Sequence, residues 1–210
     1  MLIKELIIAN ELNGENNWDK ISEHSELSED DLREYKDLLN WERVIRYNKF
    51  IPNDLLDEII TEGLVDVTMY GLWARISMSH ASDPKFIKKY NKKLAMKTVA
   101  QKNNFKASEL VTMIDIPKIG EGATQYFASD CYPFTVIEVN KKGNKIKVQG
   151  DTAKPDKDFN YYSNQNYVYE PNPNGVIYEL RLTKNCEWVM VGGTTRFSIG
   201  VRRKRQNPSF

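Results

Sequence analysis

The chain has 210 residues, of which 40% are apolar and 28% charged, with 30 Lys/Arg against 29 Asp/Glu. This composition allows a packed core and excludes an intrinsically disordered chain, and the length fits one large domain or two small ones. The sequence contains no apolar run near the ~20 residues that a membrane-spanning helix needs. Its start lacks the basic and apolar regions of a signal peptide, so we expect a soluble, cytoplasmic protein with no membrane partner.

The charge is distributed unevenly along the chain. Residues 1–63 hold seven Lys/Arg and sixteen Asp/Glu, a net charge of −9, whereas residues 64–117 and 118–210 each carry +5. An acidic end and a basic remainder either face different partners or attract each other within or between chains. The alternative is that each charged part is only a solvated surface, which is the usual case for a long helix.

The first half contains an apolar pattern with a 23-residue spacing. Trp18 and Trp41 lie 23 residues apart, a third copy begins at Met96, and Trp73 begins a degenerate one. Three copies have apolar residues at offsets of 3, 9 and 14 positions, namely Ile21, Leu27, Leu32, Val44, Phe50, Leu55, Val99, Phe105 and Leu110. Each unit reads as two short helices that bury their apolar sides only by stacking. We therefore expect buried tryptophans in a helical-repeat array.

Local signals support the helix starts. Ser28 with Asp31 forms a variant of the capping box, and acidic residues 29–31 occupy the first turn, where the helix dipole favours them. The run Trp18-Asp-Lys-Ile-Ser22 followed by Leu27-Ser-Glu-Asp-Asp-Leu-Arg-Glu-Tyr35 resembles the degenerate 23-residue helical repeats of phage and phage-like accessory proteins. That resemblance covers residues 17–63 well and 73–113 loosely, and it implies an architecture without a reaction.

The pattern changes at Pro117, Gly120 and Gly122, which end the helical half. A hairpin is predicted over 132–139 and 145–148, and further strands over 123–127, 167–169, 176–182, 187–191 and 195–199. Residues 150–165 show no regular pattern and read as a long loop. We expect an α+β protein, with a helical-repeat domain at 1–116 and a small antiparallel β barrel, SH3-like or similar, at 117–210.

The C-terminal half also resembles a family of phage proteins. Short signatures carry this resemblance: Gly122-Ala-Thr124, Thr135-Val-Ile-Glu-Val139, Pro171-Asn-Pro-Asn-Gly175, Trp188-Val189, Ser198-Ile-Gly200, Arg202 and Pro208-Ser-Phe210. The resemblance implies phage origin, hence a viral protein acting in the bacterial host cytoplasm, and no reaction.

No catalytic or metal-binding pattern is evident. Cys131 and Cys186 form no CxxC pair, and the two histidines, His24 and His80, lie in polar stretches far from them. We expect two small buried or half-buried thiols and exposed, ordinary histidines. No phosphate-binding glycine loop occurs. The sequence therefore predicts no catalytic residues, no metal, no cofactor and no enzyme.

Two basic segments are the candidate binding residues. Four cations, Arg202, Arg203, Lys204 and Arg205, lie together near the end of the chain, after strands that offer Tyr and Phe for stacking. Lysines at spacings of three and four make residues 85–94 a basic amphipathic helix, with Lys85, Lys88, Lys89 and Lys92 as its binding candidates. The alternatives are a solvated tail and a helix paired with the acidic repeats of the same chain.

The first interpretation is a non-enzymatic, phage-encoded interaction protein that binds a host protein, for example an inhibitor of a host defence system such as an anti-CRISPR protein that blocks a nuclease. This specialisation is an analogy. The alternatives are a nucleic-acid-binding protein that uses segments 85–93 and 202–205, and a nucleotide-sequestering protein with a pocket in the barrel. Salt dependence separates these classes, because phosphate binding weakens steeply with salt.

Overall fold

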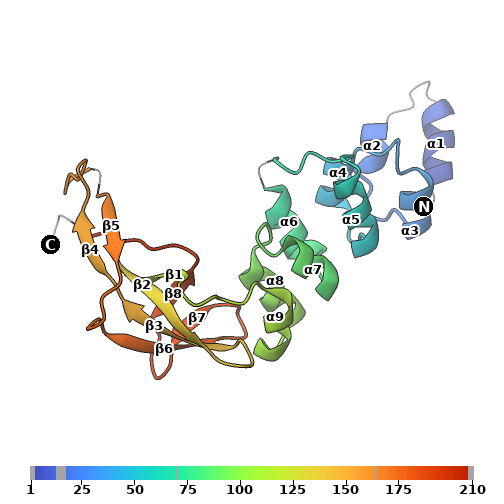
Figure 1. Ribbon diagram of the computed structural model, residues 1–210. Helices are drawn as coiled ribbons and strands as arrows, with labels where there is room; N and C mark the ends of the chain where they lie inside the picture. Colours follow the sequence, from blue (N-terminus) through green and yellow to red (C-terminus); the bar gives the residue numbers. More distant parts are fainter. Residues whose placement is uncertain (1–2, 13–17, 70, 164, 208–210) are drawn as a thin grey trace. The chain divides into compact units, whose positions relative to one another are not determined.

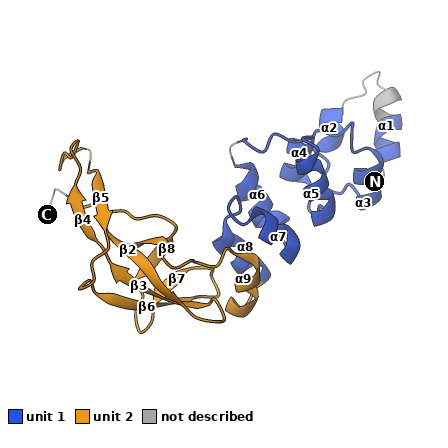
Figure 2. Cartoon of the chain, in the orientation of Figure 1, with its two compact units in different colours: residues 1–103 blue, residues 104–210 orange. Residues whose placement is uncertain are grey.

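The computed structural model describes residues 3–12, 18–69, 71–163 and 165–207, and forms two compact units, residues 1–103 and 104–210 (Figure 2). The described helices lie between Ile3 and Met113 and the described strands between Gly122 and Ile199 (Figure 1). The protein is therefore of the α+β class. The sequence predicted a domain boundary at 116–117. The structure divides at 103–104 instead, because the last helix groups with the strands that follow it. Residues 208–210, the Pro-Ser-Phe end, lie outside the described part.

Short helices make up the first unit. They are α1 (Ile3–Leu12), α2 (Trp18–Ser22), α3 (Glu29–Glu34), α4 (Trp41–Tyr47), α5 (Asn53–Thr61), α6 (Leu72–Ser79), α7 (Pro84–Tyr90) and α8 (Met96–Asn103), and α9 (Ala107–Met113) opens the second unit. The predicted capping box at Ser28 and Asp31 is present. Asp83 caps α7, where Pro84 takes the first position that tolerates a missing N–H. Among the described helices, none is long and apolar enough to cross a bilayer.

Two of the three predicted apolar offsets coincide with the core. The residues at offsets 3 and 14 are all at most 1% exposed: Ile21, Leu32, Val44, Leu55, Ile76, Ile87, Val99 and Leu110. The expectation at offset 9 fails for Phe50, which is 60% exposed. α5 begins 12 positions after Trp41, whereas α3 begins 11 positions after Trp18, so the buried place falls one position later, on Ile51.

Two helix pairs share the same internal contacts. Ser22 Oγ donates to the carbonyl of Trp18 and accepts from the N–H of Asn40, and Ser77 Oγ does the same with Trp73 and Ala95. The tryptophan rings also have matching partners 17 positions on. Trp18 lies 5.6 Å from Tyr35 and Trp73 lies 5.2 Å from Tyr90, between ring centroids.

The tryptophans differ in burial. Trp41 is buried as predicted, at 1% exposed, and its indole N–H donates to the Lys36 carbonyl at 2.9 Å. Trp18 is half-buried, which departs from the prediction. Its ring covers a tyrosine near the surface, so its outer side stays in solvent.

The second unit contains a closed antiparallel barrel. Its strands, in the order in which they pair, are β1 (Gly122–Phe127), β2 (Asp130–Val139), β3 (Lys145–Gly150), β6 (Ile177–Leu182), β7 (Trp188–Met190) and β8 (Arg196–Ile199), and β8 returns to β1. Alternate residues point inward, as the strand period of two requires. Val136, Val148 and Leu180 are therefore fully buried.

A separate two-stranded sheet does not belong to the barrel. It joins β4 (Thr152–Pro155) to β5 (Tyr167–Glu170), with Thr152 opposite Glu170. The loop predicted over 150–165 is interrupted by β4, so that expectation is wrong in part; the strand predicted at 167–169 is present as β5 but pairs with β4 outside the barrel. β4 is only four residues long and ends in proline, so neither alternation nor strand propensity marked it. In Figure 1 this sheet projects beyond the barrel strands.

Candidate functional site

The C-terminal basic segment is fixed along the edge of the second unit. Arg205 exchanges backbone hydrogen bonds with Cys131 at the start of β2, both 3.1 Å long. On the other side, the Lys204 N–H donates to the Tyr169 hydroxyl at 2.9 Å, and the Gln206 N–H donates to the Gln165 side chain. The segment is therefore an ordered strand-like element between β2 and the β4–β5 sheet, and its side chains have defined directions.

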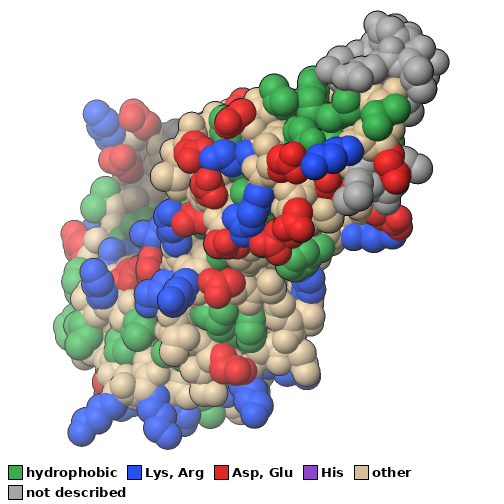
Figure 3. Space-filling model, turned by 90° about the vertical axis from the view of Figure 1, so that its right-hand side faces the viewer, with side chains coloured by type: hydrophobic (Ala, Val, Ile, Leu, Met, Phe, Trp, Pro, Cys, Tyr) green, Lys and Arg blue, Asp and Glu red, His purple; other side chains and the backbone are tan. Residues whose placement is uncertain are grey.

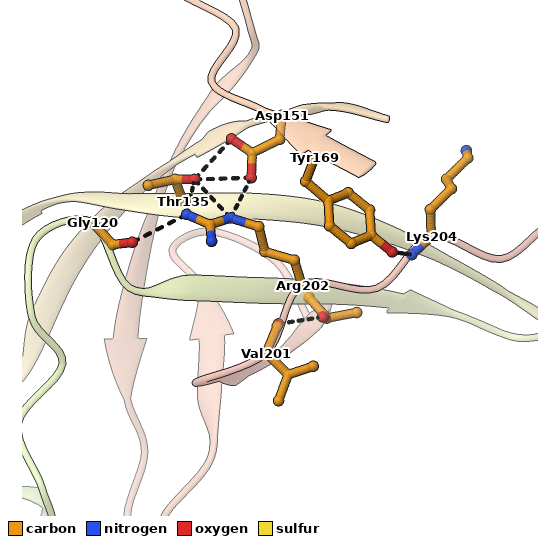
Figure 4. Close-up of polar contacts among 8 residues, drawn as sticks. Gly120, Thr135, Asp151, Tyr169, Val201, Arg202 and Lys204 are labelled. Carbon is orange, nitrogen blue, oxygen red and sulfur yellow. Dashed lines mark hydrogen bonds and ion pairs between the residues drawn. The ribbon is translucent and has the colours of Figure 1, made fainter. Parts of the chain in front are cut away.

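Arg202 belongs to the framework of the barrel. Its guanidinium donates to Asp151 at 2.9 Å, to the Thr135 hydroxyl at 2.9 Å and to the Gly120 carbonyl at 3.0 Å (Figure 4). The Asp151 side chain is only 2% exposed. A buried carboxylate needs a paired cation, so Arg202 is engaged by the protein itself and is not a free phosphate ligand.

Lys204 also makes an internal contact. Its ammonium group lies 3.9 Å from the centroid of the Tyr132 ring, a favourable cation–π distance. Burial lowers the pKa of Lys204, and the Asp130 and Cys131 charges oppose that shift. In Figure 4 its side chain points away from the guanidinium of Arg202.

Arg203 and Arg205 are the exposed members of the basic segment. Because alternate residues of an extended segment share one side, the two side chains project to the same side, from Cα atoms about 6.6 Å apart. They line a groove of about 840 Å³. We call it the tyrosine groove, because its walls include Tyr126, Tyr161, Tyr162, Tyr167 and Tyr169.

The rings of the tyrosine groove are accessible. Tyr162 is 82% exposed and packs edge-on against Tyr161, with 5.5 Å between centroids. Tyr167 and Tyr169 alternate along β5, so both face the groove. The sequence predicted the cations and stacking Tyr and Phe from the preceding strands, but it did not single out these rings. The pair Tyr161-Tyr162 and the alternation Tyr167-x-Tyr169 were the available signals.

The lysines of the first unit lie among carboxylates. Lys89 binds Asp57 at 2.5 Å, and the Tyr90 hydroxyl donates to the same Asp57 oxygen at 2.7 Å. Asp57 has a lowered pKa: burial raises it, but the hydrogen bonds from Lys89 and Tyr90 outweigh that effect. Lys85 lines a small hollow that also contains Asp54 and Asp83.

Lys88 and Lys92 complete the predicted set. Lys88 is exposed on α7, and Lys92 is exposed in the turn that follows it, because the helix ends at Tyr90 rather than continuing to residue 94. The two basic segments belong to different compact units.

Acidic and basic side chains alternate over the helical unit. Arg33 on α3 binds Asp54 on α5 at 2.7 Å, and Lys36 binds both Glu58 and Glu62. Figure 3 shows red and blue side chains next to one another on this face. Carboxylates of the first unit thus neutralise nearby cations of the same unit, including Lys89 on α7.

Histidine and cysteine behave as structural residues. His80 is 2% exposed, so the expectation of an exposed histidine is wrong there; its Nε2 lies 3.0 Å from the Ile45 carbonyl. The helices around it supply the apolar cover that its polar sequence neighbours did not indicate. Cys131 is buried and Cys186 half-buried, as predicted, and burial raises the pKa of the Cys186 thiol to about 11. Within the described ranges, no group of three or more His, Cys, Asp or Glu side chains is arranged to hold a metal.

Comparison with known proteins gives no relative. No protein-family model, no curated protein and no solved structure matches this chain.

Proposed function

We propose that this chain is a non-enzymatic binding protein whose C-terminal unit binds single-stranded nucleic acid in the tyrosine groove. One observation carries this proposal. Arg203 and Arg205 project together from a backbone fixed by hydrogen bonds, at the edge of a groove walled by tyrosine rings. Two convergent cations attract phosphates, and the adjacent rings offer faces on which bases stack.

The arrangement favours a single strand over a duplex. In a duplex the base faces are stacked on each other, so they cannot stack on the tyrosine rings. An unpaired strand exposes its bases, and each base that stacks on an aromatic ring contributes about 1–3 kcal/mol. The groove volume of about 840 Å³ lies within the range of roughly 300–1,000 Å³ for ligand sites.

The helical unit supports a second candidate, a protein partner. We infer that the helix pairs are copies of one repeat, because Ser22 and Ser77 make the same two hydrogen bonds and Trp18 and Trp73 contact equivalent tyrosines. Repeat arrays present extended surfaces to proteins. Leu38, Tyr47 and Phe50 are large, apolar and 44–60% exposed on this unit. The host-defence inhibitor suggested by phage resemblance, for example an anti-CRISPR protein, belongs to this candidate.

Fluorescence anisotropy with a labelled ten-nucleotide strand, free or annealed to its complement, tests the first proposal at low salt. We expect the free strand to bind and the duplex to bind more weakly. The variant Tyr161→Ala/Tyr162→Ala should weaken binding about tenfold, the loss of one stacked base. Phe50→Ala, which removes an exposed ring from the other unit, is the matched control. Failure of both nucleic acids to bind would reject the proposal and favour the protein partner.

A further inference from the structure

A second hollow opens at the end of the barrel beside the tyrosine groove. This barrel-mouth pocket has a volume of about 670 Å³ and includes Gln125, Tyr132, Phe134, Tyr178 and Lys204 in its lining. Phe127, Asp130 and Lys204 line both hollows. A strand that lies in the groove is therefore adjacent to the pocket.

Aromatic rings form the floor of the barrel-mouth pocket. Phe134 lies 5.6 Å from Tyr178 and 5.3 Å from Phe197, between ring centroids, and Tyr178 lies 6.2 Å from Phe197. Phe134 and Phe197 are at most 6% exposed. A flat aromatic ligand that enters the pocket would meet Phe134 and Tyr178, which line it, while Phe197 packs against both rings without lining the pocket.

Gln125 is the unusual residue of the pocket. On β1 it shares the inward face with Ala123, since alternate strand residues point to the same side. It is only 5% exposed, yet its side-chain amide makes no hydrogen bond to any described residue. Among the described residues, the side-chain atoms that are both buried and unpaired belong to His24 and His80, so the Gln125 amide is accessible from the pocket and can hydrogen-bond a ligand there.

The charged groups that line the pocket already have partners. Asp151 is held by Arg202 and Thr135. Asp130 accepts from the Asn207 N–H at 2.8 Å and from the Tyr132 hydroxyl at 3.4 Å. Lys204, at the rim, lies over the Tyr132 ring and supplies positive charge there. The Gln125 amide is thus the group best placed to choose among ligands.

We infer that the barrel-mouth pocket binds one nucleobase, and that the Gln125 amide reads its edge. This inference rests on the proposed function for its strand, because the base would come from the nucleic acid in the tyrosine groove. An amide donates and accepts at adjacent atoms, and glutamine pairs in this way with N6 and N7 of adenine. The pocket therefore selects adenine within an otherwise sequence-tolerant strand.

The test uses the full chain and two kinds of probe. The first is an eight-nucleotide oligothymidine with and without one central adenine; the second is free adenosine monophosphate. We expect the adenine to strengthen binding at least about fivefold, the lower end for a bidentate amide–base contact. Gln125→Met, of similar volume, should abolish this preference. Gln101→Met, at an exposed position of the other unit, is the control.

A second variant guards against a folding defect at Gln125. Ala153 lines the pocket from β4, outside the barrel, so Ala153→Phe should fill the pocket and remove the same preference. Equal binding of both oligonucleotides by the wild type, or a preference that survives both variants, would overturn the inference while leaving strand binding intact. Binding of adenosine monophosphate without binding of either oligonucleotide would keep the base pocket and reject the proposed strand binding.

Discussion

Arg202 and Asp151 form an ion pair across 51 residues, with Nε 2.9 Å from Oδ2 and the carboxylate side chain 2% exposed. The pair joins the segment after β8 to the segment after β3, and the Thr135 hydroxyl on β2 completes it. It also separates the four consecutive cations into different roles, because Arg202 is used within the barrel while Arg203 and Arg205 remain exposed.

Arg202→Gln should destabilise the chain by about 3 kcal/mol, since it leaves a buried carboxylate unpaired. Urea unfolding followed by circular dichroism measures the loss. Arg203→Gln, the exposed neighbour, should change the free energy of unfolding by no more than about 0.5 kcal/mol. The double variant Asp151→Asn/Arg202→Gln should recover part of the loss, and a double variant no more stable than Arg202→Gln alone would show that the pair is not the cause.

Ser22→Ala and Ser77→Ala should destabilise the helical unit by similar amounts, about 1–3 kcal/mol each. Each substitution leaves the backbone N–H of Asn40 or Ala95 without its acceptor. Urea unfolding followed by tryptophan fluorescence reports the change, with the exposed Ser108→Ala as control. Clearly unequal losses would contradict the inferred equivalence of the two helix pairs.

Stability of the helical unit should fall in mild acid because of His80. Burial lowers the pKa of His80, the hydrogen bond to Ile45 opposes this, and Arg75 and Lys102 lower it further. The unfolded chain, with a histidine pKa of about 6.5, therefore takes up the proton first as pH falls. The contribution of neutral His80 is complete well above pH 6.5 and is lost as pH falls through that value toward the folded pKa, at up to about 1.4 kcal/mol per pH unit.

His80→Asn removes this titration, so its unfolding free energy should differ less between pH 7.5 and pH 5.5 than that of the wild type. Comparison of differences between pH values, rather than of absolute stabilities, cancels the packing cost of the substitution. An identical pH dependence in both proteins would assign the acid sensitivity to other groups.

Lys89→Gln should have little effect on either stability or nucleic-acid binding. Its ion pair with Asp57 is half exposed, with side chains 49% and 36% accessible, and such pairs contribute less than about 1 kcal/mol. Because Asp57 already neutralises Lys89, we expect the salt dependence of strand binding to stay as in the wild type. A flatter dependence would place α7 in the binding surface.

Local patterns predicted much of the fold. The hairpin of β2 and β3 and the strands β6 to β8 followed from alternation and turn residues, and the helix at Ser28 followed from its capping box. β4 was missed because its pairing with β5 is a long-range contact that four residues without alternation do not encode. Phe50 was misplaced because α5 begins one position later after Trp41 than α3 does after Trp18, which shifts the buried position to Ile51.

The sequence predicted the cations of the site but not the contacts that give each of them its role. Arg202 and Arg203 are adjacent and chemically identical, and only the distant Asp151 distinguishes them. Gln125 carried no signal at all, since its role depends on barrel closure around Phe134 and Phe197. The sequence showed which residue types were candidates, whereas the partners of these residues depend on contacts between segments far apart in the sequence.

The salt dependence of strand binding tests the central claim most directly. Kd for a ten-nucleotide single strand is measured over a series of salt concentrations for the wild type, for Arg203→Gln/Arg205→Gln, and for Lys141→Gln/Lys142→Gln. The last variant removes two exposed cations from the turn at the other end of β2. We predict that the arginine variant flattens the log–log slope by about 1.4, at about 0.7 per phosphate contact, while the lysine variant keeps the wild-type slope. The same slope in all three proteins would contradict strand binding in the tyrosine groove.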